Sequence, residues 1–147
     1  MTQSIQKCFI ILLATLAILL SAPVDAKSKR GQLKKFEVAQ MKYASSIRWN
    51  EFEMAWGYVD PVYRNLKPLT DLEIERLKQV QVVGYTEKTM DVLENGNVEI
   101  RVEIRLVNRN TQAERVVIDT QVWRWDAEGK RWWLTTGLPD FSAKPFG

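Results

Sequence analysis

The sequence predicts an α+β fold in which N-terminal helices pack on a four-stranded antiparallel meander. Apolar residues recur every three or four positions before Gln79 and every second position after it, which indicates helices followed by strands. Four alternating runs are expected as strands: Val80–Leu93, Val98–Asn108, Ala113–Trp125 and Arg131–Leu138. Their connections are too short for parallel neighbours, so the order of elements predicts an α+β meander.

The first helix is expected to begin at Leu33 and to end near Ser45 and Ser46. Its apolar residues fall at spacings of three and four and so form one stripe: Leu33, Phe36, Ala39 or Gln40, Tyr43 and Ile47. Asn50 is the expected N-cap of a second helix, because Glu51 and Glu53 in its first turn suit the helix dipole. Its buried face would be formed by Phe52, Ala55, Trp56 and Val59.

The segment after the second helix is expected to be irregular as far as Thr70. Asp60 and Pro61 end or kink that helix, because the residue before a proline avoids the α region. A third, short helix is then expected over Asp71–Lys78, capped by Thr70 or Asp71. Its inward residues would be Leu72 and Leu77.

The composition excludes several classes of function. The chain has 147 residues and a net charge of +3, but six basic residues and one acid lie before Phe36, so the remainder is mildly acidic. This distribution argues against nucleic-acid binding. The sequence has no histidine and a single cysteine, Cys8, which removes Ser-His-Asp and Cys-His catalysis and histidine or thiolate metal sites.

Residues 1–26 have the layout of a signal peptide. Lys7 precedes an apolar run that ends before Pro23, and Val24 and Ala26 would be the small residues at the cleavage site. We expect residues 27–32 to be a flexible basic arm, residues 33–138 the folded domain and residues 139–147 a partly loose tail. The protein would be periplasmic or secreted. The alternative is an uncleaved inner-membrane anchor, because the flank after the apolar run is the more basic one.

The parity of the last two strands predicts where the tryptophans lie. Val98, Ile100, Val102, Ile104 and Leu106 share one face of the second strand, and Glu99, Arg101, Glu103 and Arg105 share the other. A three-residue loop over Ala127–Gly129, with Gly129 in the left-handed region, would pair Val122 with Leu134 and Trp123 with Trp133. The Val122 side would then be the core, with Trp132 and Arg124 on it, and Asp119 would lie on the outer face.

This register predicts a tryptophan-rich outer face, and the role of that face has two interpretations. The interface candidates are Arg101, Trp123, Trp125 and Trp133, and the simplest partner is a second copy of the chain in a homodimer formed by opposed sheets. The alternative is that the rings bury one another and only stabilise the hairpin.

Residues at the mouth of a pocket between helices and sheet could bind a ligand. The pocket candidates are Tyr43, Trp56, Tyr63 and Trp132. Tyrosine and carboxylate pairs can transfer protons without histidine, but structural roles are the expectation for the polar candidates: Tyr43, Tyr58, Asp60, Tyr63, Tyr85 and Asp119. We predict no catalytic residue, no metal site and no cofactor.

The segment Ala44–Trp56, the Asp60-Pro61 pair and the final Gly129–Leu134 run resemble the nuclear-transport-factor-2-like superfamily, over about residues 33–138. The resemblance implies a conical, polyketide-cyclase-like fold: helices on a strongly curved sheet, with a pocket between them and frequent dimerisation through the sheet. The superfamily holds dehydratases, isomerases, cyclases, secretion-system assembly proteins and non-catalytic exported proteins. Its enzymes commonly use a pocket histidine or aspartate, and this chain has no histidine.

These observations predict an exported bacterial member of that superfamily, of unknown function. It would be a non-catalytic domain that binds a small apolar ligand or a protein partner in the cell envelope. The alternatives are a histidine-free enzyme of the cyclase or isomerase type and a membrane-anchored component of an envelope assembly.

Overall fold

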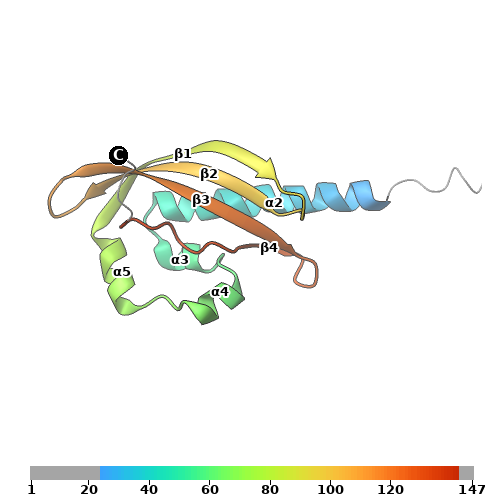
Figure 1. Cartoon of the computed structure of the whole chain (residues 1–147), viewed down its shortest axis with the longest axis horizontal. Coiled ribbons are helices and arrows are strands. Elements are labelled where there is room, and N and C mark those ends of the chain that lie inside the picture. The colour runs from blue at the N-terminus through green and yellow to red at the C-terminus, as the bar shows by residue number, and fades with distance from the viewer. Residues whose placement is uncertain (1–23, 143–147) are drawn as a thin grey trace, which may run out of the picture. The chain divides into compact units, whose positions relative to one another are not determined.

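The computed structural model describes residues 24–142 and confirms the α+β plan. The chain divides into two compact units, residues 1–31 and 32–147, and the fold described below is that of the second. In Figure 1, α2 and α3 lie against one face of the sheet formed by β1 to β4. The elements are α2 (Val24–Arg48), α3 (Phe52–Trp56), α4 (Pro61–Leu66), α5 (Asp71–Lys78), β1 (Val80–Val92), β2 (Val98–Asn108), β3 (Glu114–Asp126) and β4 (Arg131–Leu134).

Helix α2 is longer at both ends than the sequence predicted. Residues 27–32, expected as a flexible arm, are helical, because lysine, arginine and glutamine are good helix formers and no proline interrupts them. The side chains of residues 27–31 are exposed, so this part of the helix buries no apolar surface. Phe36, Tyr43 and Ile47 form the buried stripe as predicted, whereas Leu33 is 47% exposed. The signal peptide itself lies almost wholly outside the described residues.

The helical region differs from the prediction at Asn50, in the segment after Asp60 and at Leu72. Asn50 does not cap α3. It has a φ of 61°, its Nδ2 donates to Val80 O at 2.8 Å and its Oδ1 accepts from Val82 N at 3.2 Å, so its side chain ties the end of α2 to β1. The expected irregular connection after Asp60 contains the helix α4, in which Pro61 fits the first turn because its missing N–H is not needed there. Thr70, one of the two expected caps, is the N-cap of α5, and it forms a capping box with Glu73. Leu72, expected inward, is 61% exposed.

The sheet is an open antiparallel meander in the order β1-β2-β3-β4. It is not strongly curled or closed (Figure 1), so the strongly curved, conical shape expected from the sequence is wrong. Strand β4 has only four residues, and its last residue, Leu134, forms a bridge with Val59 in the segment between α3 and α4. Strand β4 does not pair with β1, so the sheet is not closed into a barrel.

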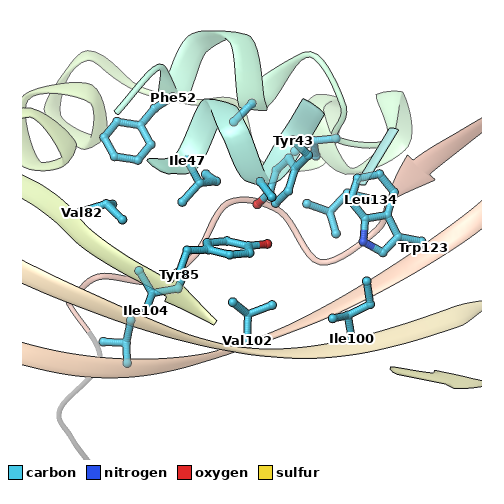
Figure 2. Close-up of a cluster of buried hydrophobic side chains, with 14 of the residues drawn as sticks. Tyr43, Ile47, Phe52, Val82, Tyr85, Ile100, Val102, Ile104, Trp123 and Leu134 are labelled. Atoms are coloured by element: carbon cyan, nitrogen blue, oxygen red, sulfur yellow. The ribbon is translucent and has the colours of Figure 1, made fainter. Parts of the chain in front are cut away.

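The core lies between α2, α3 and the face of the sheet that carries the even-numbered residues of β2. Val98, Ile100, Val102, Ile104 and Leu106 are buried as predicted, and Arg101 and Arg105 are exposed on the opposite face. The register places odd-numbered residues of β3 on the core side, among them Val117, Gln121 and Trp123. Figure 2 shows Trp123 and Leu134 facing α2 within this core.

The predicted register of β3 with β4 is wrong by one residue. Trp123 pairs with Leu134, Arg124 with Trp133 and Trp125 with Trp132. A slip of one residue exchanges the two faces of a strand, so Trp123 is fully buried where the sequence analysis placed it on the outer face. Its ring packs at 5.4 Å from Tyr43 and 5.9 Å from Phe36.

The conformation of the β3–β4 turn explains why the predicted register of these strands is wrong by one residue. The loop has four residues, since Asp126 pairs with Arg131, and Lys130 rather than Gly129 adopts a positive φ. The Asp126 carboxylate accepts hydrogen bonds from the N–H groups of Glu128 and Gly129 at 3.1 Å and from Trp133 Nε1 at 3.1 Å. Gly129 is needed for close approach, because a Cβ there would lie 2.7 Å from Asp126 Oδ2. The alternation of apolar and polar residues could not show that hydrogen bonds to the Asp126 side chain hold a four-residue loop.

This register predicts that Trp123 and Trp133 differ strongly in their contribution to stability. Trp123→Ala empties a core site and should lower the free energy of unfolding by about 3–5 kcal/mol. Trp133→Ala removes a half-buried ring stacked 3.6 Å from Arg131 and should cost about 1–2 kcal/mol. Urea denaturation of both variants, and of the milder Trp123→Phe and Trp133→Phe pair, measures the difference. Equal losses at the two positions would contradict the register.

Candidate functional site

A groove of about 600 Å³ opens between α4, α5, the start of β1 and the segment after β4. Its apolar wall consists of Trp56, Tyr63, Leu69, Leu77, Val80, Leu138, Pro139 and Phe141. Lys67, Glu73, Arg76, Arg115 and Asp140 supply its charges. A second hollow of about 260 Å³ lies beside it and shares Leu69 and Leu77. The larger groove is of the size that small-molecule sites have.

The aromatic wall of the groove is held by two close approaches. The rings of Trp56 and Tyr63 lie 6.3 Å apart at 74°, an edge-to-face arrangement that stabilises aromatic pairs. Gly137 has a φ of 79°, and a Cβ there would lie 2.5 Å from Tyr63 Oη. Glycine therefore allows the segment after β4 to run directly against Tyr63.

The segment after β4 is ordered where the sequence predicted a partly loose tail. Phe141 is 6% exposed and its ring lies 5.6 Å from that of Phe52. Within the described part of this tail, the chain returns toward α5, as the red trace in Figure 1 shows. Phe141 thereby closes one side of the groove.

Asp60 holds α4, which carries Tyr63, on the sheet. Its backbone N–H donates to Leu134 O at 2.8 Å and its Oδ1 accepts from Val62 N at 2.8 Å. Arg124 donates to Asp60 Oδ2 from Nε at 3.1 Å and from Nη2 at 2.6 Å. The Asp60 side chain is 7% exposed, and charged hydrogen bonds of this kind are stronger than neutral ones. Asp60 therefore joins β4 through its backbone N–H, and α4 and β3 through its carboxylate.

The charged side chains of the groove differ in their hydrogen-bond and ion-pair partners. Glu73 Oε2 accepts hydrogen bonds from Thr70 N and Oγ1 at 2.8 and 2.7 Å, and these bonds, with nearby Arg76, lower the pKa of Glu73. Lys67 Nζ lies 5.6 Å from the Tyr63 ring. Within residues 24–142, Arg76 and Arg115 form no ion pair. Positive charge is therefore available in the groove while Glu73 is satisfied by its helix cap.

A second polar cluster lies inside the core, away from the groove. Gln121 Nε2 donates to Tyr85 Oη at 3.1 Å and to Asp119 Oδ2 at 2.9 Å, and Trp123 Nε1 donates to Gln121 Oε1 at 3.3 Å. The Tyr43 hydroxyl is buried without a hydrogen-bond partner in the described residues. Figure 2 shows the hydroxyls of Tyr43 and Tyr85 in the same space between α2 and the sheet.

Burial sets the pKa values of this cluster. It raises the pKa of Asp119 to about 6, against the opposing effect of the hydrogen bond from Gln121. Burial also raises the pKa of Tyr43 well above its ordinary value, with Asp119 and Tyr85 adding to the effect. The pKa of Tyr85 is raised for the same reason. Both tyrosines therefore stay protonated at neutral pH, where Asp119 ionises.

The structure places the four pocket candidates in two regions. Trp56 and Tyr63 line the groove. Tyr43 is fully buried in the core, and Trp132 packs 5.0 Å from Phe36 and donates from Nε1 to Gln32 O at 2.8 Å. Trp132 lies on the core side as predicted, but Arg124, expected beside it, points to the other face with Trp133.

The four interface candidates also separate. Arg101 is exposed and Trp133 half-buried on the outer face. Trp123 and Trp125 belong to the core side because of the register, and Trp125 packs against Trp132 at 5.6 Å. The predicted three-tryptophan surface is therefore absent among the described residues. Asp119, predicted on the outer face, lies on the core side for the same reason.

Sequence reasoning missed Arg76, Arg115 and Phe141. The alternation of β3 carries a signal for Arg115, which pairs with the buried Leu106 and so lies on the core side at the end of the sheet. That signal could be used only with the correct register. Phe141 gave no periodic signal, because it follows the last strand in an irregular segment.

Comparison with protein-family models, with curated proteins and with solved structures finds no match to this chain. Between residues 24 and 142, no helix is both long and apolar enough to cross a membrane. The same residues contain no group of three or more metal-ligating side chains.

The raised pKa of Asp119 predicts a pH-dependent stability with a defined sign. The folded state binds the proton more tightly than the unfolded state, so this residue's contribution is favourable near pH 4 and is lost as the pH rises through about 6. Asp119→Asn should therefore gain about 1–3 kcal/mol relative to the parent chain between pH 4 and pH 7. Urea denaturation across this range measures the change.

Asp126→Asn is the matched control for this experiment. Hydrogen bonds from Gly129, Trp133 and Glu128 lower the pKa of Asp126, so its contribution is present at neutral pH and lost in acid. As the pH rises, the free energy of unfolding relative to the parent chain should therefore change in opposite directions for the two variants. If the difference in unfolding free energy between Asp119→Asn and the parent chain does not change with pH, the Asp119 carboxyl of the parent chain is solvated in the folded protein.

Proposed function

We propose that this chain is an exported, non-catalytic domain that binds a small apolar ligand in the groove. The observation that carries the proposal is the aromatic wall of Trp56, Tyr63 and Phe141 around a space of about 600 Å³. Ligand sites are concave and mostly apolar, with a few polar groups that fix orientation. The groove has an apolar wall, while the other half of its lining is polar or charged, and α4 with the Asp60 bonds gives it a frame.

The core cluster supports a non-catalytic domain over a histidine-free enzyme. Tyr43 is fully buried and Tyr85 is 8% exposed, and Asp119 is already bonded to Gln121. A catalytic acid or base must reach a proton on the substrate, and these hydroxyls face the protein interior. The cluster is better explained as a polar network that orders the core.

The order of elements supports the proposal that the chain belongs to the nuclear-transport-factor-2-like superfamily. Helices followed by an antiparallel meander fit the nuclear-transport-factor-2-like resemblance, while the open sheet departs from the conical shape that it implies. A second copy of the chain would dock on the outer face of the sheet, where Arg101 and Ile118 are exposed and no groove residue lies. Export is supported by the layout of residues 1–26.

Nile red, an uncharged apolar dye, tests the groove. The parent chain should bind it with a rise and blue shift of fluorescence, and Leu69→Trp should weaken binding at least about tenfold by filling the groove. Leu66→Trp is the matched control, since Leu66 is 77% exposed and outside the groove lining. The absence of binding to the parent chain, or equal weakening by both variants, would refute the proposed function.

Intact-mass measurement tests export separately. Chain purified from the periplasm or medium of an exporting host should begin at Lys27, because cleavage is expected after Ala26. A mass that retains Met1, with the protein in the membrane fraction, would favour the anchored alternative.

A further inference from the structure

The groove combines an apolar wall with two arginines that come from different elements. Arg76 lies on α5, and Arg115 lies near the start of β3 on the core side of the sheet. Both line the same space as Trp56 and Phe141. A ligand that fills the groove would therefore contact aromatic rings and guanidinium groups together.

These arginines are available to a ligand. Arg124 is paired with Asp60, whereas within residues 24–142 neither Arg76 nor Arg115 has an ion-pair partner. A guanidinium offers five N–H donors in a planar fork that fits a carboxylate. Arg115 is half-buried, and partial burial strengthens its attraction for an anion.

The two acids of the groove offset only part of the charge of its three basic side chains. The bonds from Thr70 hold Glu73 Oε2 in the capping box of α5. Asp140 Oδ1 accepts hydrogen bonds from Ser142 N at 2.8 Å and from its hydroxyl. Lys67, stacked near the Tyr63 ring, adds a third cation to the lining.

We propose that the natural ligand of the groove is an anionic amphiphile, a molecule with one acidic group on an apolar body. Its acidic head binds Arg76 and Arg115, and its body lies along the wall that contains Trp56, Tyr63 and Phe141. This inference rests on the proposed function, because it specifies which apolar ligand the groove takes. A monocarboxylate of medium chain length is the simplest member of the class.

Decanoate and decanol test the charge preference, because they share an apolar chain and differ in the head group. Each is titrated against the Nile red complex, with decanoate kept below its micellisation concentration. Decanoate should displace the dye from the parent chain at a concentration at least tenfold lower than decanol. Raising the salt concentration should weaken the binding of decanoate and leave the binding of decanol unchanged.

Arginine variants locate the head group. Arg76→Gln and Arg115→Gln should each weaken decanoate about fivefold or more, since each removes a charged hydrogen-bond donor, and should leave decanol displacement unchanged. Arg101→Gln is the control, because Arg101 is exposed on the outer face of the sheet. Circular dichroism checks the fold, and Arg76, exposed on α5, keeps the test usable if Arg115→Gln unfolds.

The outcomes separate the two proposals. If Nile red binds in the groove but decanol displaces it as well as decanoate does, or the arginine variants do not affect decanoate, the anionic class is wrong and the apolar-ligand function stands. If Nile red does not bind the parent chain, the proposed function fails first.

Discussion

The packing of Trp123 against Tyr43 and Phe36 is the contact on which the rest of the structure depends. It fixes which face of β3 is turned toward α2, because side chains alternate along a strand. With Trp123 inward, Gln121 and Asp119 enter the core side and Arg115 reaches the groove. The opposite register would bury the Val122 side and place Arg115 outside the groove. The position of one indole therefore decides the chemistry available at both candidate sites.

The second constraint is the bridge between Val59 and Leu134, which occupies the short edge of the sheet. It places Asp60 where it can cap α4 and bind Arg124. Because α4 carries Tyr63, the same carboxylate that stabilises the fold positions a wall of the groove. Gly137 then lets the chain after β4 pass against Tyr63. Fold stability and groove shape are therefore coupled through Asp60.

The two polar sites illustrate opposite ways of placing polar groups beside apolar surface. In the core, Gln121 links Tyr85, Asp119 and Trp123, so most donors and acceptors meet within the protein. In the groove, Arg76 and Arg115 keep their donors for solvent or a ligand. A buried polar group costs free energy unless it is bonded, and the core network reduces that cost. The groove arginines are not subject to the same penalty because solvent reaches them.

The sequence by itself determined the α+β class, the strand boundaries to within a few residues, the buried face of β2 and the bounds of α5. These features depend on local periodicity and on neighbours along the chain. Only the tertiary structure decided the β3–β4 register, the open sheet and the groove. The register depends on the Asp126 turn and on the fit of Trp123 under α2, and Trp56, Phe141 and Arg115 meet only after folding. Alternation cannot distinguish two registers that each bury an apolar face, because the decisive energy comes from packing against another element.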